Sequence, residues 1–292
     1  MKLHFIGIGK MGLPMAGHLA AAGHAVSVSD PSPVQLELAQ ARGLLPALDL
    51  NSALAQADVV FSSLPNDAAL CSVAQTVAAA ARRGTVYVDT STVSLAASGQ
   101  AALGLAAAGV PYVRSTVSGN NKMAEAAQLT VMASGPRVAY DQVLPLLQCL
   151  GPNHFYLGEQ EQARLMKLVV NLMIAQTSAM LSEALSLGRK GGLDWSAMWQ
   201  VLTASAVGSP IVKAKSVALG QRDFTPTFTV HQMIKDLDLI LGQAKDSHVP
   251  LPQTSLTQQL MHAAVAQGDG VHDYAAIIKA VERSAGLSDS LE

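Results

Sequence analysis

The chain opens on Lys2-Leu-His-Phe-Ile-Gly-Ile-Gly-Lys-Met-Gly12, an apolar run that leads directly into a G-x-G-x-x-G spacing. Gly7 permits a tight turn, and Gly9 has no side chain to keep a pyrophosphate away from the backbone. Gly12 lets the following helix pack close to the strand, and the N-terminus of that helix offers N–H groups to phosphates. The stretch therefore predicts the first strand, loop and helix of a dinucleotide-binding domain.

The residues around this glycine motif decide how much weight it carries. A helical pattern at 13–22 ends before Gly23, and 25–29 has the alternation of a second strand. Asp30 follows, eighteen residues after Gly12, close to the ~20-residue offset of the acid that binds the adenosine ribose. The alternative is a glycine-rich turn without a ligand and an ordinary exposed Asp. The complete series favours the cofactor site.

Asp30 also bears on the choice of cofactor. Its carboxylate would accept a hydrogen bond from a ribose 2′-hydroxyl and would repel a 2′-phosphate. An NADP site usually places an Arg nearby, but the residues that follow are Pro31, Ser32 and Pro33. The sequence therefore predicts NAD, with NADP less favoured. The cofactor-binding residues expected in this region are Gly7, Gly9, Lys10, Met11, Gly12 and Asp30.

Length and composition narrow the class of protein. The 292 residues suffice for one large or two ordinary domains, and only 14% are charged while 50% are hydrophobic. The net charge of −2 gives no electrostatic case for binding nucleic acid or an acidic membrane. Cys71 and Cys149 offer no metal-ligand spacing and no redox pair, and each is expected to be a small buried side chain. A reducing, cytoplasmic environment and no metal site are therefore expected.

The first half alternates short β-like runs with alanine-rich helical runs, which predicts a doubly wound, mostly parallel sheet. Strands are expected at 3–7, 25–29, 58–63, 85–89, 111–114, 129–134 and 154–157. Helices are expected between them, at 13–22, 33–42, 51–56, 67–81, 94–108 and 138–150.

After Gly158 only helical patterns remain, the first being a long run at 160–190. That run contains Lys167, Asn171, Gln176 and Glu183, so a buried helix is expected and not a membrane span. Further helices are expected at 194–203, 209–217, 232–246, 253–266 and 273–284. The chain is thus predicted to have an NAD-binding Rossmann domain over 1–160 and an all-α substrate and oligomerisation domain over 161–292, with a long interdomain helix.

Polar segments follow three of the expected strands, at the sheet edge where ligands bind. Leu64 and Pro65 could line the adenine and ribose, although a plain strand-to-helix turn explains them equally well. Thr92, in the Asp89-Thr-Ser-Thr run, could face the nicotinamide ribose or the substrate, or belong to a helix N-cap cluster. Residues 115–121 are expected to be a small-residue loop able to hold a carboxylate, or a simple turn.

Lys167 and Asn171 stand four residues apart in the long helix, so they share one of its faces. A lone Lys on a helix is usually solvated, but here apolar residues surround it in the sequence. In an apolar cleft the ammonium pKa would fall, which would make Lys167 a usable general acid and base.

Taken together, these segments resemble the β-hydroxyacid dehydrogenases of the 3-hydroxyisobutyrate dehydrogenase family. The matching motifs run in family order across nearly the whole length: Phe5-Ile-Gly-Ile-Gly-Lys-Met-Gly-Leu-Pro-Met-Ala16, Asp89-Thr-Ser-Thr92, Val117-Ser-Gly119, Lys167-Leu-Val-Val-Asn171, Ser182-Glu-Ala184 with Gly188, and Phe228 with Lys235-Asp236.

The resemblance implies a role for individual positions. Lys167 would be the catalytic acid/base, and Asn171 would orient the substrate hydroxyl. Ser118 and Gly119 would bind the substrate carboxylate, with Asn120 beside them. Thr92 and Lys235 would lie at the nicotinamide side, and Asp236 would orient Lys235 or cap structure.

Departures from the family pattern concern the carboxylate loop. The family commonly has Asp-Ala-Pro-Val-Ser-Gly-Gly where this chain has Arg114-Ser-Thr-Val-Ser-Gly-Asn120. Arg114 could add a positive charge near the site or face solvent, and Asn120 adds an amide. These changes leave the reaction class intact and put the substrate in question.

The expected reaction is hydride transfer between NAD and a small, carboxylate-bearing β-hydroxy acid. The alternatives are an NAD(P)H-dependent reductase of small semialdehydes or glyoxylate, and an imine reductase. Lys167 weighs against the imine reductase, because enzymes of that type on this scaffold generally lack it. A non-enzymatic NAD sensor is disfavoured because Lys167, Asn171 and Ser118 occur together. The low charge and the apolar helix also suggest a homodimer or homotetramer.

Overall fold

The computed structural model describes residues 1–291, and the chain divides into two compact units at residue 167. The predicted functional domains, 1–160 and 161–292, stay a prediction.

The first unit is built on an eight-stranded sheet in the order β3-β2-β1-β4-β5-β6-β7-β8. Neighbouring strands are parallel except β6 and β7, which are antiparallel. The strand order reverses between β1 and β4, and ligands of such sheets bind at this reversal, beyond the carboxyl ends of the strands. The strands are β1 (Lys2–Ile6), β2 (Ala25–Ser29), β3 (Leu45–Pro46), β4 (Val59–Ser62), β5 (Val86–Asp89), β6 (Tyr112–Ser118), β7 (Thr130–Ser134) and β8 (Asn153–Tyr156).

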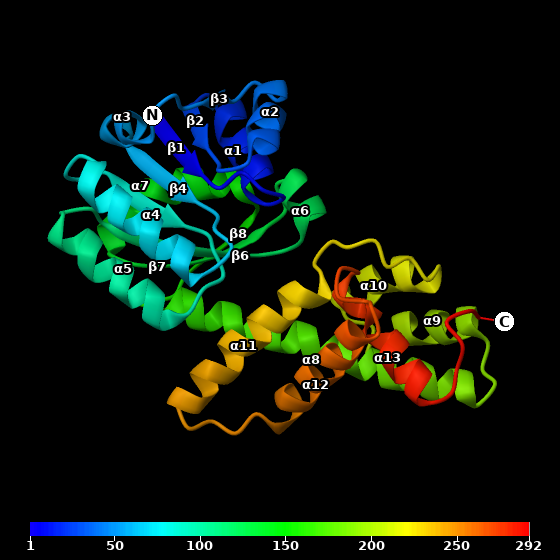
Figure 1. Ribbon diagram of the computed structural model, residues 1–292. Helices are drawn as coiled ribbons and strands as arrows, with labels where there is room; N and C mark the ends of the chain where they lie inside the picture. The colour runs from blue at the N-terminus through cyan, green and yellow to red at the C-terminus, as the bar shows by residue number, and fades with distance from the viewer. Residues whose placement is uncertain (292) are drawn as a thin grey trace. The chain divides into compact units, whose positions relative to one another are not determined.

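Helices cover both faces of this sheet, as Figure 1 shows. Alternating side chains along β1 feed two separate cores, with Leu3 and Phe5 in one and Ile6 in the other. The first core is closed by α1 (Gly12–Ala21), α2 (Pro33–Ala41) and α7 (Arg137–Leu147), and the second by α3 (Leu50–Gln56), α4 (Asp67–Ala80) and α5 (Leu95–Ala107). The predicted doubly wound, mostly parallel sheet is therefore confirmed.

The second unit is helical. It continues α8 (Gln162–Lys190), which begins in the first unit, and between residues 162 and 291 the described chain adds one isolated β-bridge, Thr229 to Asp273. Its remaining helices are α9 (Trp195–Ala204), α10 (Pro210–Gly220), α11 (Val230–Asp246), α12 (Pro252–Ala266) and α13 (Ile277–Ser284). The all-α character predicted after Gly158 is confirmed.

Helix α8 is long and apolar enough to cross a membrane by length and composition alone. It nevertheless carries the buried polar side chains Asn171, Ser178 and Ser182, and Asn171 is bonded to another helix of the same unit. These contacts are those of a core helix in a folded domain, which supports the prediction of a buried helix.

Four local features differ from what the sequence predicted. Residues 115–118 are not a loop, because β6 continues to Ser118 and pairs with β7 from Arg114 to Ser118. β-branched residues and the antiparallel partner extend the strand, and only Gly119 and Asn120 precede the short helix α6 (Asn121–Glu125), which the sequence did not predict. The two-residue strand β3 was also not predicted, and Cys71 and Cys149 are half-buried free thiols instead of fully buried ones.

Candidate active site

The glycine loop has the geometry that a phosphate cradle needs. Gly7 has φ +83°, a conformation that side chains disfavour, and a Cβ there would collide with the carbonyl of Ser63. A Cβ at Gly12 would collide with the carbonyl of Gly7, so this glycine brings α1 against the loop. A Cβ at Gly9 would meet no atom within 4 Å. The space above Gly9 is therefore open to a pyrophosphate, and the residues present fit a dinucleotide.

Asp30 lies at the end of β2 and is held against this loop. Its Oδ2 accepts a hydrogen bond from the Ile8 N–H at 2.9 Å, and its Oδ1 accepts one from the Ser32 N–H at 2.8 Å. A carboxylate oxygen has a second lone pair, so both oxygens can still accept from ribose hydroxyls. Lys10, beside the loop, is exposed, and Met11 is half-buried.

The ends of β4 and β5 are tied together. The N–H of Leu64 donates to Ser91 Oγ at 2.8 Å, and the N–H of Ser94 donates to Asp67 Oδ1 at 2.8 Å. Ser94 also caps α5 through the N–H of Ala97, so the helix-cap interpretation of this segment is correct.

Of the residues predicted to touch cofactor in these two loops, Leu64 and Thr92 are half-buried and Pro65 is exposed.

A buried ion pair lies beneath these loops. Arg164, in the first turn of α8, pairs with Asp89 at the end of β5, and both side chains are 0% exposed. Burial would lower the pKa of the Arg164 guanidinium, but Tyr112 and Asp89 outweigh burial and raise it. Burial and the charge of Asp89 also raise the pKa of Tyr87 well above its usual value. Burial likewise raises the pKa of Tyr112, so both tyrosines stay neutral hydrogen-bonding groups.

Sequence reasoning did not find the role of Arg164. A charged residue in the first turn of an otherwise apolar helix, together with an Asp ending an apolar strand, was the available signal.

The predicted carboxylate-binding segment is shorter than expected. Ser118 ends β6 and is half-buried, while Gly119 and Asn120 are exposed. Gly119 has φ +136°, and a Cβ there would lie 2.7 Å from Leu129 Cδ2. Asn120 caps α6, with its Oδ1 accepting from the N–H of Met123 at 3.0 Å. The amide Nδ2 of Asn120 is thus the group with which it could donate to a ligand.

Lys167 and Asn171 both lie on α8, as predicted. Lys167 is half-buried and Asn171 is buried. In the second unit, the Nδ2 of Asn171 donates to Asp236 Oδ2 at 2.5 Å. The other oxygen of Asp236 pairs with Lys235 Nζ at 2.8 Å. Asp236, buried on α11, therefore orients Asn171 as well as Lys235, and the link to Asn171 was not predicted.

Arg114 neither faces solvent nor brings a free charge to the carboxylate segment. Its guanidinium is buried, forms an ion pair with Glu161, and stacks over the ring of Tyr112 at 4.5 Å. Glu161 thus neutralises the positive charge that Arg114 could have added near the site. The pairing explains how an Arg can be accommodated where the family commonly has an Asp.

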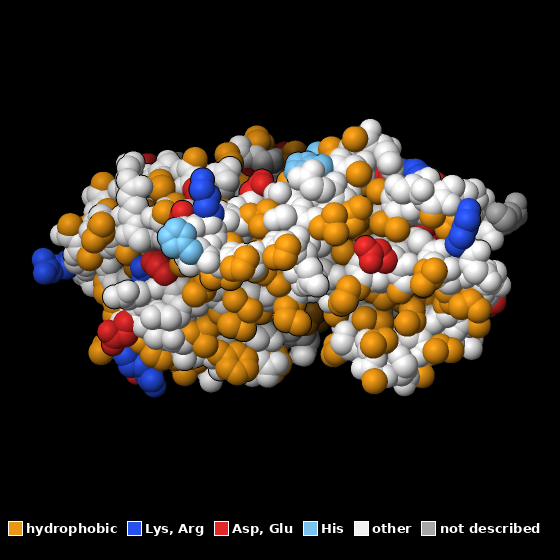
Figure 2. Space-filling view, turned by 90° about the horizontal axis from the view of Figure 1, so that it is seen from below, with side chains coloured by type: hydrophobic (Ala, Val, Ile, Leu, Met, Phe, Trp, Pro, Cys, Tyr) orange, Lys and Arg blue, Asp and Glu red, His pale blue; other side chains and the backbone are white. Residues whose placement is uncertain are grey.

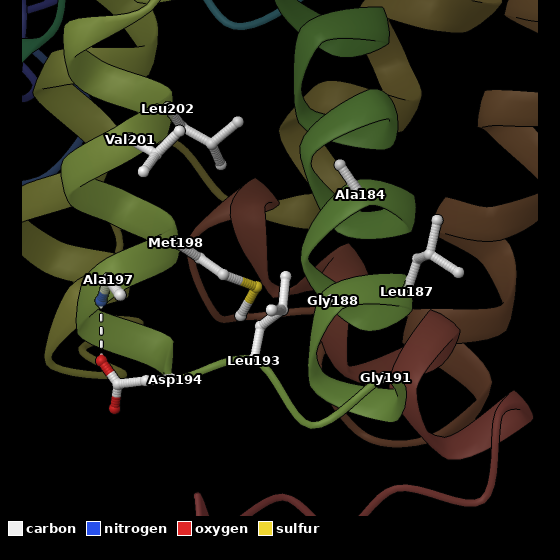
Figure 3. Close-up of a pocket in the computed structure, with 10 residues that line it drawn as sticks. All are labelled: Ala184, Leu187, Gly188, Gly191, Leu193, Asp194, Ala197, Met198, Val201 and Leu202. Atoms are coloured by element: carbon white, nitrogen blue, oxygen red, sulfur yellow. Dashed lines mark hydrogen bonds between the residues drawn. The ribbon is translucent and has the colours of Figure 1, made fainter.

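An apolar cavity of about 530 Å³ lies between α8 and α9 in the second unit (Figure 3). Leu193 and Met198 point toward Gly188, and the carboxylate of Asp194 accepts from the N–H of Ala197 at 2.7 Å as a helix cap. Asp194 is the one ionisable side chain of the lining, and its carboxylate serves as the cap of α9. Among residues 1–291, no cluster of three His, Cys, Asp or Glu side chains could hold a metal ion.

Comparison with known proteins gives two family matches that together cover most of the chain. Residues 2–158 match the NAD binding domain of 6-phosphogluconate dehydrogenase, and residues 162–281 match the NAD-binding domain of NADP-dependent 3-hydroxyisobutyrate dehydrogenase. These matches confirm the prediction of a nicotinamide dinucleotide cofactor.

Full-length relatives agree with these matches. A 2-(hydroxymethyl)glutarate dehydrogenase of Eubacterium barkeri is 33% identical over 99% of this chain and 98% of its own length. A 2-hydroxy-3-oxopropionate reductase of Escherichia coli is 30% identical over 97% of each chain. The solved structure of a Mycobacterium tuberculosis 3-hydroxyisobutyrate dehydrogenase with L-serine is 27% identical, covers 95% of this chain and 97% of its own, and superposes with a TM-score of 0.87.

Proposed function

The chain belongs to the β-hydroxyacid dehydrogenase family, and from that premise we propose that it transfers hydride between NAD and a small β-hydroxy acid, with Lys167 as the general acid and base. As a member of this family it is an oxidoreductase that uses a nicotinamide dinucleotide and acts on CH–OH groups. The substrate, the preference for NAD and the role of Lys167 are the parts that we propose.

The cofactor, when bound, accepts or returns the hydride at the nicotinamide ring. The chain's own residues do the rest. In the oxidation direction, Lys167 Nζ takes the proton of the substrate hydroxyl as its carbon loses hydride, which yields a carbonyl, an ammonium and the reduced cofactor. In the reverse direction the Lys167 ammonium returns that proton to the developing alkoxide. Asn171 would hold the hydroxyl oxygen, and Ser118 and Gly119 would bind the carboxylate, with Asn120 Nδ2 beside them.

The observation that carries this proposal is the placement of Lys167 and Asn171 on α8. Residues four apart share a helix face, so an acid/base and an amide are offered to one substrate group. Asn171 is also fixed in orientation through its bond to Asp236. A proton donor that is held beside an oriented amide suits a hydroxyl or carbonyl substrate better than a passive nucleotide sensor.

The preference for NAD is supported by Asp30. Both of its oxygens are anchored to backbone N–H groups, so the carboxylate cannot easily swing away from a ribose 2′-phosphate. The residue that follows is Pro31, which offers no positive charge to a phosphate.

A second candidate is the reduction of small semialdehydes or of glyoxylate. The relative from Escherichia coli is a 2-hydroxy-3-oxopropionate reductase, and the compound in its name is a small acid with an aldehyde group. The same residues serve both directions, so the two functions differ in the preferred carbon skeleton and in the direction of turnover.

An assay over a panel of β-hydroxy acids, small semialdehydes, glyoxylate and cyclic imines, each with NAD and NADP or their reduced forms, tests the proposal. Absorbance of the reduced cofactor gives kcat/KM for each pair. We expect the highest value for a β-hydroxy acid with NAD. Higher values for imines, or a clear NADP preference, would contradict the substrate class or the cofactor choice respectively.

We also infer that the chain works in the cytoplasm as a homodimer or homotetramer. Large apolar side chains reach the surface of α8 at Met173, Met180 and Leu187, and Val201 of α9 lies exposed beside the apolar cavity. Figure 2 shows many apolar and few charged side chains on the face that it draws. Exposed apolar patches of this kind mark association surfaces, and a second copy is the partner proposed for this one.

A further inference from the structure

We propose that Arg164 is a positioning residue for the reaction, which fixes the turn of α8 that carries Lys167 to the ends of β4 and β5. The inference rests on the proposed function, because it assumes that Lys167 exchanges the proton. Arg164 precedes Lys167 by three residues, so about 4.5 Å of helix axis separates them. A shift of the first turn of α8 would therefore move Lys167 with it.

The guanidinium is bonded in four directions. Its Nη1 donates to the carbonyl of Ser91 at 2.5 Å, and one Nη2 N–H donates to the hydroxyl of Tyr112 at 2.7 Å. Nη2 also forms the ion pair with Asp89, and Nε donates to Ser98 Oγ at 3.3 Å. A planar guanidinium held by four acceptors has one orientation, which an ammonium on a flexible stem would not have.

The same network reaches the loops that are proposed to hold the cofactor. Asp89 Oδ1 accepts from Ser91 Oγ at 2.5 Å, and Ser91 Oγ accepts in turn from the N–H of Leu64 at 2.8 Å. One continuous set of bonds thus connects the α8 turn with the segments after β4 and β5. This network would keep the first turn of α8 and the loops after β4 and β5 in fixed positions relative to each other.

A gain in stability alone does not explain why Arg164 and Asp89 are buried as an ion pair. Taking two ions out of water costs free energy that their attraction barely repays, and apolar replacements of similar size are often neutral or stabilising. Directional bonds to a carbonyl and two hydroxyls add what an apolar pair lacks, which is a fixed geometry.

Arg164→Lys tests the proposal, because it keeps the positive charge against Asp89 and removes the planar fork. We expect kcat to fall about 10- to 100-fold, because small displacements of a catalytic group lower the rate by factors of this size. The Kd for NADH, measured by fluorescence titration, should change less than about twofold, because the bonds from Asp89 through Ser91 to Leu64 remain. Arg137→Lys is the matched control, since Arg137 is exposed and pairs with Asp141 in the same unit, and it should behave as the wild type.

A double-mutant cycle with Lys167→Ala gives a readout that a merely structural role would not move. If Arg164 acts through Lys167, adding Arg164→Lys to Lys167→Ala should not lower the residual single-turnover rate further. Three results would each overturn the inference. The two substitutions could lower the single-turnover rate by independent factors that multiply, Arg164→Lys could keep the wild-type kcat, or its affinity for NADH could fall in parallel with kcat. Near-normal turnover of Lys167→Ala itself would instead overturn the proposed function.

The neutral pair Asp89→Asn/Arg164→Gln covers the case in which Arg164→Lys does not fold. It leaves no unpaired buried charge, so it should keep a cooperative thermal transition while kcat falls about 10- to 100-fold. A wild-type kcat in this double variant would contradict the positioning role.

Discussion

His4 illustrates how a single buried residue couples the sheet to pH. It lies on β1 with its ring nitrogens against Ser27 Oγ at 2.8 Å and Ser29 Oγ at 3.0 Å on β2. The side chain is fully buried, and burial lowers its pKa from 6.5 to about 4. The folded protein therefore keeps this imidazole neutral under conditions in which the unfolded chain would protonate it.

We predict a loss of stability between pH 6.5 and pH 4 that His4→Gln largely removes. Above pH 6.5 both states are neutral at this residue, and below pH 4 both are protonated. Between these values only the unfolded state binds the proton. Lowering the pH from 6.5 to 4 therefore lowers the free energy of unfolding by about 3 kcal/mol in total. Urea unfolding at pH 7, 6, 5 and 4 measures the free energy of unfolding of the wild type and of the variant. Identical pH slopes for the wild type and the variant would argue against the buried neutral histidine.

Residue-scale reasoning was weakest where partners lie far apart in the sequence. The place of Asp30 after β2 and the N-cap role of Ser94 follow from local patterns. The neutralisation of Arg114 by Glu161 does not, because the two residues are 47 positions apart. From the sequence alone, Arg114 was therefore expected either to add a positive charge near the site or to face solvent.

At the scale of elements, the sheet was predictable because strand, turn and helix patterns repeat with regular spacing. The two-residue β3 lacks the length for a periodic pattern, and helix α6 begins beside the carboxylate segment, where turn residues dominate. The β-branched residues Thr116 and Val117 favour the extension of β6 to Ser118, but the extension also depends on pairing with β7, which the local sequence does not show. Small and polar residues there resembled a loop for this reason.

Helices α8 and α11 meet within the second unit through the bond between Asn171 and Asp236. We predict that Asp236→Asn lowers kcat/KM about tenfold or more, because it weakens a charge-assisted bond to Asn171 and removes the charge beside Lys235. Asp238→Asn is the matched control on the same helix, since Asp238 is exposed and accepts from Gln258 Nε2 at 2.7 Å. Equal kcat/KM values for the two variants in steady-state assays would show that Asp236 does not position Asn171.

At the scale of the whole molecule, the apolar surface of α8 predicts self-association. Light scattering coupled to size-exclusion chromatography should give a mass of at least twice 30.3 kDa. Leu187→Glu should lower that mass, because it buries a charge at the proposed contact. Leu103→Glu, on α5 and equally exposed at 76%, should leave the mass unchanged. A monomeric wild type would rule out the proposed assembly.

The order of parts along the chain also has a functional consequence. A cofactor-binding sheet comes first, and Lys167 stands at the residue where the two compact units divide. The glycine loop and Asp30 specify the cofactor, whereas Lys167 is required for the proposed proton transfer. Removing Lys167 should therefore separate chemistry from cofactor binding.

The proton transfer by Lys167 is tested by measuring both the kcat of Lys167→Ala and its Kd for NADH. We expect a loss of kcat of about 10²- to 10⁴-fold, the usual contribution of a positioned acid/base, with the Kd for NADH unchanged within about twofold. A kcat near that of the wild type would show that Lys167 does not transfer the proton.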